Sequence, residues 1–157
     1  YSHASVMYNA LQEIPALQKL VQVGVRDYCE EEWNLICNSN YRVISYLDKA
    51  IKERQYEGET WKHITEEIVN HLPQKVYISF DVDGLDRKPS PNTGTPVQGG
   101  FEVAEIFYLL KKINDSGRKL IGFDLVEIGV GQTDWDCNVG AHCLWRLCNL
   151  MIHNNNN

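Results

Sequence analysis

Two hydrophobic periodicities alternate along the chain. Some segments repeat apolar residues at helical spacing, whereas others are short, almost continuous runs of Val, Ile, Leu and Phe. Short apolar runs are typical of strands covered on both faces, and the spaced pattern is typical of helices with one buried face. The pattern predicts helices within residues 4–20, 30–39, 58–72, 102–115 and 135–152, and strands at 21–25, 41–46, 75–83 and 119–129.

Residues that stop or cap helices support these boundaries. Pro15 interrupts the first helical pattern, and Thr60 is placed to cap the third helix at its N-terminus. Pro73 and Gly117 follow helical segments at positions where a helix normally ends.

The alternation of strands and helices predicts parallel βαβ units. We therefore expect a three-layer α/β/α fold with a mainly parallel sheet, formed by residues 1–152 as a single domain. The polar segment 153–157 is predicted to be a disordered tail.

The composition limits the kinds of partner that the protein can bind and indicates its cellular compartment. The formal net charge of −6 argues against nucleic acid or an anionic membrane as a partner and suits a small cationic substrate. No apolar stretch reaches the roughly 20 residues that span a bilayer, and no signal-peptide pattern opens the chain. The five cysteines include no CxxC pair, which is typical of reduced thiols in a cytoplasmic protein.

The strand at 75–83 ends in carboxylates. Asp81 and Asp83 lie two residues apart, so both project to the same side of an extended strand, and Glu127 stands near the end of the last strand. Ligands of parallel sheets bind beyond the carboxyl ends of the strands, so we expect these acids to meet at one rim. Neighbouring carboxylates need a cation or a proton between them, which suits Mg²⁺ or Mn²⁺; a solvated acidic turn is the alternative.

The segment "SFDVDGLDRKPSPNTGTPVQGG" resembles the motif S-F-D-x-D-x-x-D and the following Gly-Thr-Gly-x-Pro-like loop of the ureohydrolase family. That family includes arginase, agmatinase and formimidoylglutamase. "VGVRD", "GFDLVEIGVGQTDWD" and "YSHAS" resemble further family segments, although the last has Ala4 where the family usually has Gly and the second lacks a usual Pro. The motif residues are Ser79, Phe80, Asp81, Asp83, Asp86, Gly94, Thr95, Pro96, Gly99 and Gly100.

The resemblance implies an arginase-like fold with two Mn²⁺ ions, and it implies roles for individual residues. Asp81 matches the carboxylate that bridges both ions, and Asp83 matches a ligand of one of them. Glu127 matches the acid that receives the guanidinium group of the substrate; pairing with Arg26 is the alternative. His3 matches a non-ligand histidine that shuttles protons or contacts substrate; an ordinary exposed histidine is the alternative.

Two other acids receive structural expectations. Asp86 matches a motif acid that is not a metal ligand, and Asp124 matches a family acid that we expect to be buried and hydrogen-bonded.

The implied reaction is hydrolysis of a guanidino compound, in which a hydroxide bridging the two metal ions attacks and urea is released. The family also needs a D-A-H-x-D segment and a further upstream His for its metals, and neither occurs in these 157 residues. We therefore expect the chain to be the C-terminal part of a longer enzyme and to be inactive alone. The resemblance further implies a homotrimer or homohexamer for the full-length protein.

Alternatives remain for substrate and for function class. Arg26 and Asp27 favour an arginase-like enzyme slightly, but agmatine and formiminoglutamate stay open as substrates. A non-catalytic binding or assembly domain that has lost its metal site is the main competing function. A mononuclear Mg²⁺ phosphotransfer domain ranks last, because the loop after the acids contains prolines and no Walker lysine.

Overall fold

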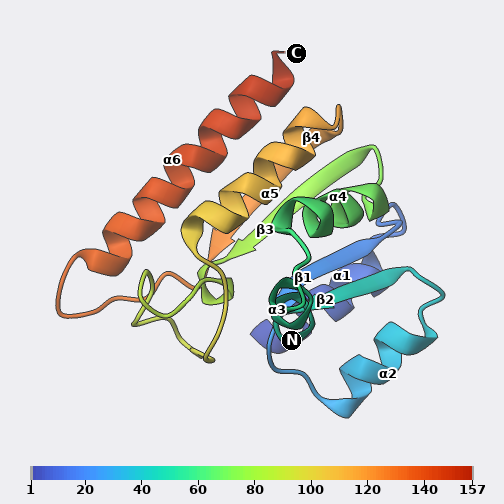
Figure 1. Ribbon diagram of the computed structural model, residues 1–157, viewed down its shortest axis with the longest axis horizontal. Coiled ribbons are helices and arrows are strands. Elements are labelled where there is room, and N and C mark those ends of the chain that lie inside the picture. Colours follow the sequence, from blue (N-terminus) through green and yellow to red (C-terminus); the bar gives the residue numbers. More distant parts are fainter. Residues whose placement is uncertain (1, 157) are drawn as a thin grey trace.

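The structure, a computed structural model, describes residues 2–156. It is an α/β fold in which strands and helices alternate (Figure 1). The elements in order are η1 (His3–Ser5), α1 (Val6–Glu13), β1 (Leu20–Val25), α2 (Glu30–Asn38), β2 (Val43–Leu47), α3 (Asp48–Tyr56), α4 (Trp61–His71), β3 (Lys75–Asp81), η2 (Val82–Gly84), α5 (Val103–Asp115), β4 (Lys119–Val126) and α6 (Trp135–Asn155).

All strand pairing within the described residues is parallel, which confirms the predicted α/β class with parallel strands. Strand β1 pairs with β2, and β3 pairs with β4, so the hydrogen-bonded strands form two pairs. Helices α4, α5 and α6 run alongside β3 and β4 in Figure 1, whereas α1 and α2 accompany β1 and β2.

The predicted stop and cap residues act where the sequence indicates. Helix α1 ends at Glu13, before Pro15. The Thr60 hydroxyl accepts a hydrogen bond from the backbone N–H of His63, at 3.2 Å, and so caps α4. Gly117, with a φ of 77°, follows α5 in the left-handed conformation that commonly ends a helix.

One hydrophobic core connects the two strand pairs. Buried residues from β2, α3 and α4 form a single cluster with those of β3, α5, β4 and α6. Its most deeply buried large side chains are Phe101, Ile51, Ile64, Ile68, Leu120 and Leu147. The molecule therefore does not depend on one continuous ladder of backbone hydrogen bonds to hold both pairs together.

A bulge in β1 brings its backbone against this core. The register between β1 and β2 shifts between Val23 and Val25, and the intervening Gly24 has a φ of 88°. A Cβ atom on Gly24 would lie 2.4 Å from the ring of Phe101. Phe101 is fully buried, with its ring centroid 5.3 Å from that of Trp61.

Two segments differ from the sequence prediction. Helix α3, which follows β2 without a connecting turn, was not predicted. Helix α6 continues to Asn155, so residues 153–155 are helical rather than part of a disordered tail. The Asn154 side chain explains the extension, because it accepts from the N–H of Leu120 and donates to Asn114 and to the main-chain oxygen of Arg118. Residue 157 of the predicted tail lies outside the described residues.

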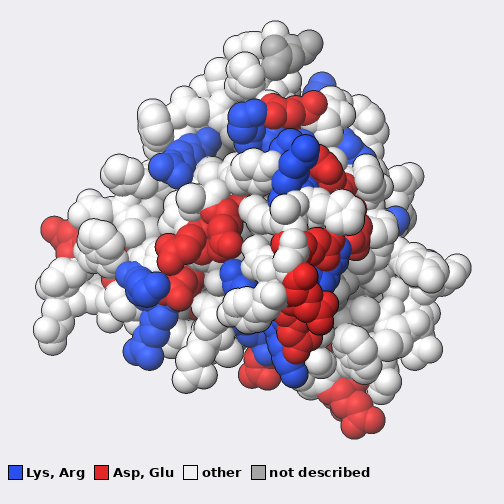
Figure 2. All heavy atoms as spheres, viewed as in Figure 1, with Lys and Arg blue, Asp and Glu red and all other residues white. Residues whose placement is uncertain are grey.

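Acidic and basic side chains share the surface. On the face shown in Figure 2, acidic residues gather over the middle of the molecule, with lysines and arginines interspersed among them. Among the described residues, no helix has the length and apolar character needed to cross a bilayer.

Candidate functional site

The predicted acids lie at the same edge, by the carboxyl ends of β3 and β4. Asp81 is the last residue of β3 and pairs in register with Val126, the residue before Glu127. Asp83 follows in η2, and its backbone N–H donates to the Asp81 carboxylate at 2.8 Å. Parallel pairing therefore places the three carboxylates at one rim, as the sequence predicts.

Electrostatics show that these carboxylates influence one another. Burial of the Asp81 carboxyl group raises its pKa, and the negative charges of Asp83 and Glu127 raise it further. The hydrogen bond from the Asp83 N–H and the positive charge of Arg26 act in the opposite direction. Asp81 thus lies where negative charge accumulates, which is the condition that favours a bound cation or a shared proton.

Arg26 ties the end of β1 to the same rim. Its guanidinium donates to the main-chain oxygen of Asp83 and, at 3.2 Å, to that of Gly24. Among the ion pairs of the described chain, none joins Arg26 to Glu127, so the structural pairing considered for Glu127 is not formed. Arg26 instead holds η2 in place through the backbone.

The loop that precedes α5 packs against the acids. The Thr95 hydroxyl donates to Oδ2 of Asp83 at 3.2 Å, whereas Oδ1 of Asp83 is buried and has no partner within the described protein. A Cβ atom on Gly94 would lie 3.1 Å from Oε2 of Glu127, so the Glu127 carboxylate lies against the Gly94 backbone. The motif residues at 94 and 95 therefore contact two of the three acids.

The backbone of Glu127 is also held by residues that sequence reasoning missed. The Thr93 hydroxyl donates to the main-chain oxygen of Glu127 at 2.8 Å. Asn92 donates to the Asp136 carboxylate through its N–H, at 3.0 Å, and through its side chain, at 2.8 Å. The only sequence signal for these contacts is the polar pair Asn92–Thr93 within the motif loop, and it does not identify the partners.

His3 is not joined to this rim. It lies in η1, is exposed, and its main-chain oxygen accepts from the N–H of Val6. Within the described residues, no hydrogen bond or ion pair connects its side chain to Asp81, Asp83 or Glu127. Its role stays a prediction.

The two acids expected to be structural both accept hydrogen bonds. Asp86 accepts from the backbone N–H of Lys88 at 2.9 Å, which is turn chemistry. Asp124 accepts from the Ser79 hydroxyl at 2.8 Å and is half-buried, so the expected hydrogen bond is present but the burial is incomplete.

The carboxylate oxygens at the rim are the type of ligand that a hard divalent ion binds, but they are too few to hold one. Carboxylate oxygens are the ligands that Mn²⁺ and Mg²⁺ accept, and the unpartnered Oδ1 of Asp83 is free to coordinate. However, the described part of the chain brings no three His, Cys, Asp or Glu side chains together in a group that could hold a metal. These residues therefore fit part of a metal site, and the remaining ligands would have to come from elsewhere.

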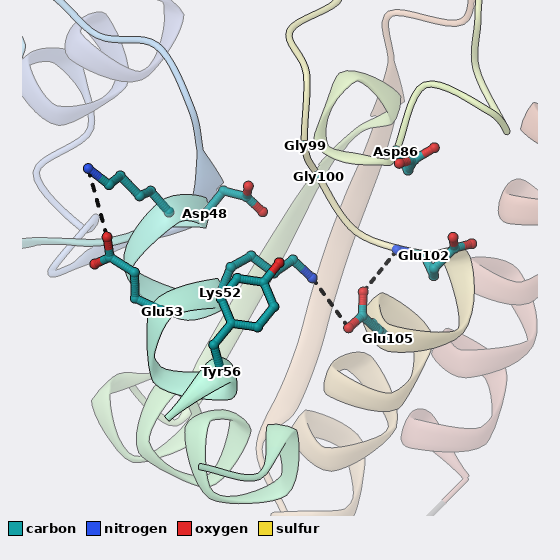
Figure 3. A pocket seen from close by; sticks show the side chains of 10 residues that line it. Asp48, Lys52, Glu53, Tyr56, Asp86, Gly99, Gly100, Glu102 and Glu105 are labelled. Atoms are coloured by element: carbon teal, nitrogen blue, oxygen red, sulfur yellow. Dashed lines mark hydrogen bonds and ion pairs between the residues drawn. The ribbon is translucent and has the colours of Figure 1, made fainter. Parts of the chain in front are cut away.

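A separate cavity lies between α3 and the start of α5 (Figure 3). It has a volume of about 630 Å³ and is lined by residues of α3, of the loop at Gly99–Gly100 and of the start of α5. An ion pair between Lys52 and Glu105, at 3.5 Å, spans it. Asp48 lines it with only 7% of its surface exposed, and its Oδ1 has no partner among the described residues. None of Asp81, Asp83, Glu127 or His3 is among the lining residues, so this cavity is not the predicted site.

Comparison with known proteins gives one consistent family. The model of the Arginase family matches residues 1–136. The arginase of Emericella nidulans is 35% identical over 123 residues, which cover 75% of this chain and 36% of that protein. The guanidinobutyrase of Pseudomonas aeruginosa is 30% identical over 159 residues, which cover 93% of this chain and 45% of that protein.

Solved structures share the fold. The proclavaminate amidino hydrolase of Streptomyces clavuligerus superposes with a TM-score of 0.80 at 22% identity, covering 98% of this chain and 50% of that one. A putative agmatinase of Clostridium difficile gives a TM-score of 0.71 at 26% identity, with 96% and 50% covered. The chain spans half the length, or less, of each of these proteins.

Proposed function

Because the chain belongs to the arginase family, we propose that it carries the substrate-binding rim of a manganese-dependent hydrolase that acts on a guanidino compound and releases urea. The observation that supports this most directly is that Asp81, Asp83 and Glu127 lie at the carboxyl ends of two paired parallel strands and that the charges of Asp83 and Glu127 act on Asp81. The names of its relatives, which include arginase, guanidinobutyrase and agmatinase, support a guanidino substrate as the class.

Glu127 is proposed to bind the substrate cation. A carboxylate and a guanidinium are planar and can form two parallel hydrogen bonds, which fixes the orientation of the guanidinium carbon. Contact with Gly94 limits where the Glu127 carboxylate can point, because that backbone lies against its Oε2. Glu127 therefore neutralises and orients the substrate at the rim.

Asp81 and Asp83 are proposed to contribute metal ligands. Two bound Mn²⁺ ions would supply a water molecule whose pKa is lowered toward neutrality, as a poor electrophile such as a guanidinium carbon requires. Asp83 would also relay a proton from the attacking water to the departing amine, so that the C–N bond breaks to give urea and a neutral amine. His3 would pass the other proton of that water to solvent.

Arg26 does not indicate which guanidino compound is the substrate. Its side chain is used to hold the main chain at Asp83 and Gly24. The retained Arg26 therefore has a structural explanation, and arginine gains no advantage from it over agmatine or guanidinobutyrate.

A test of the proposal uses the full-length protein loaded with Mn²⁺ and measures urea released from arginine, agmatine and guanidinobutyrate. We expect turnover of at least one compound and a loss of about 100-fold or more in kcat/KM for Glu127→Gln, since a charged partner is worth about 3 kcal/mol at such a site. Glu66→Gln is a matched control, because Glu66 forms an exposed i,i+4 ion pair with Lys62 on α4. Absence of urea from all three compounds would refute the proposal.

The 157-residue chain by itself is proposed to be inactive. Calorimetric titration with Mn²⁺ should show weak binding, because the described residues supply no group of three donors. Tight binding of two ions would contradict this. A full-length protein that bound no Mn²⁺ and released no urea would favour the non-catalytic binding or assembly domain.

Assembly and compartment complete the proposal. We propose a homotrimer or homohexamer for the full-length protein, to be checked by its mass in solution. Cytoplasmic localisation is supported by five cysteines that are all free thiols.

A further inference from the structure

Glu127 has a backbone conformation that its side chain disfavours. Its φ is 63°, and only Asn40 and Tyr41 share a positive φ among the other described non-glycine residues. A residue with a Cβ atom is uncommon in this left-handed region and remains there only where its surroundings hold it. The conformation therefore needs a specific cause at this position.

Thr93 contacts the backbone of Glu127 directly. Its hydroxyl donates to the main-chain oxygen of Glu127 at 2.8 Å, and only 7% of the Thr93 surface is exposed. Fixing the carbonyl fixes the rotation of the peptide unit that follows Glu127. The next loop residue, Gly94, lies against the Glu127 carboxylate. Two consecutive residues thus contact both the backbone and the functional end of Glu127.

The loop that carries Thr93 is itself anchored. Asn92 makes two hydrogen bonds to Asp136, a residue at the start of α6 that is only 2% exposed. Close backbone contacts add to this anchor, because a Cβ atom on Gly129 would lie 1.8 Å from the main-chain oxygen of Asn92. The loop and the segment after β4 are therefore packed as one unit.

We propose that Thr93 is a positioning residue, which holds Glu127 in its left-handed conformation and so aims its carboxylate at the substrate, and that the Asn92–Asp136 pair anchors Thr93. The inference rests on the proposed function, because Glu127 must be the guanidinium-binding acid for its aim to affect turnover. It goes beyond that function by assigning roles to three residues outside the predicted metal and substrate sites.

The experiment compares three variants of the full-length protein. Thr93→Val removes the hydroxyl with little change in shape, and Thr93→Ser retains it. Thr65→Val is the matched control, because the fully buried Thr65 also donates to a main-chain oxygen at 2.8 Å, but within α4. A readout of KM separates positioning from folding, since a smaller folded fraction lowers the apparent kcat and leaves KM unchanged.

For Thr93→Val we expect KM for the guanidino substrate to rise and kcat/KM to fall about ten-fold, the effect of losing one well-placed hydrogen bond. Thr93→Ser should stay within about two-fold of the wild type, as should the KM of Thr65→Val. Equal KM values for Thr93→Val and wild type, or a Thr93→Ser variant as impaired as Thr93→Val, would overturn the inference. Thr93→Ala replaces Thr93→Val if the latter does not fold.

A structural measurement separates failure of this inference from failure of the proposed function. Crystal structures of the wild-type and Thr93→Val proteins report φ of Glu127 whether or not urea is produced. A change of Glu127 to an extended φ in the variant supports the positioning role, and retention of the left-handed φ overturns it. Absence of urea from the wild type would refute the proposed function and leave this structural result to decide the hydrogen-bond role.

Discussion

Near the rim, the backbone of one segment packs directly against the backbone of another. At such a contact a glycine cannot be replaced without a steric clash. At Gly129 the hydrogen atom faces the main-chain oxygen of Asn92, where a Cβ atom would lie 1.8 Å away. The neighbouring atoms belong to the backbone, so they cannot rotate away as the end of a side chain would. The loop as a whole would have to move.

We therefore predict that Gly129→Ala lowers the free energy of unfolding by about 1–3 kcal/mol, the usual cost of overpacking. Chemical denaturation of the purified variant measures the loss. Gly84→Ala is the control, because nothing lies within 4 Å of its Cβ position and its φ is not positive. If both variants matched the wild type, the close contact at Gly129 would be incorrect.

The buried Asp136 predicts a dependence of stability on pH. Burial acts to raise its pKa, but the hydrogen bonds from the Asn92 side chain and N–H outweigh that effect, so its pKa lies below the ordinary value. A carboxyl group with a lowered pKa in the folded state stabilises the fold above its unfolded pKa. That contribution is lost as the pH falls through the folded pKa.

Asp136→Asn should therefore be less stable than the wild type at pH 7, and the difference should shrink as the pH falls below about 4. Thermal unfolding of both proteins between pH 7 and pH 3 checks this. A stability difference that stays constant over that range would contradict the assignment.

The sequence predicted where the acids lie, but it did not predict the hydrogen bonds that fix their positions. Asp81 and Glu127 could be placed at one rim because parallel strands end on the same side of a sheet. Thr93 and Asn92 could not be matched to Glu127 and Asp136, because their contacts depend on the path of an irregular loop across separations of 34 and 44 residues. The left-handed backbone conformation of Glu127 could not be predicted either, since glutamate has no preference for a positive φ.

Among the elements, helix α6 shows how one polar side chain can set the end of a helix. Asn154 makes three hydrogen bonds to segments outside α6, at 2.8, 2.9 and 2.9 Å. One of these satisfies the N–H of Leu120, a residue in β4 with no exposed surface. The last turn of α6 is thereby fixed to β4.

We predict that Asn154→Ala destabilises the protein by about 1–3 kcal/mol, because it leaves the buried N–H of Leu120 without a partner. The adjacent Asn155→Ala should change stability by less than about 0.5 kcal/mol, since the partner of the exposed Asn155 side chain among residues 2–156 is the main-chain oxygen of Met151, within its own turn. Denaturation midpoints of the two variants provide the measurement. Equal losses would mean that the Asn154 contacts do not fix the helix.

Most elements were predictable because their apolar periodicity is strong, and the exceptions have physical reasons. Helix α3 buries only Asp48 and Ile51 and follows β2 directly, so it has neither a full apolar stripe nor a preceding turn signal. The segment 153–155 is a run of polar residues, and its helical state depends on the tertiary contacts of Asn154 rather than on its own pattern.

At the scale of the whole molecule, side-chain packing rather than strand pairing unites the chain. The two parallel strand pairs are separate in their hydrogen bonding, yet one cluster of buried residues runs through both. Trp61 contributes to this connection, because it packs on Phe101 and donates to the main-chain oxygen of Glu105 at 3.0 Å.

We therefore predict that the 157-residue chain unfolds in a single cooperative transition, as domains of about this size usually do. Far-ultraviolet circular dichroism and tryptophan fluorescence should give coincident denaturation curves. Two separated transitions would show that the strand pairs are independent units and that the shared core is too weak to couple them.

The contact between Gly24 and Phe101 carries a consequence for how this sequence can diverge. Position 24 lacks a side chain because the ring of Phe101 fills that space and because residues with a Cβ atom rarely adopt a φ of 88°. Neither residue can be exchanged alone without a collision or a void in the core. A smaller residue at 101 would remove the collision but not the strain of a positive φ at 24. Across descendants of this gene, glycine should therefore persist at 24 with an aromatic residue at 101, although the two sites are 77 positions apart.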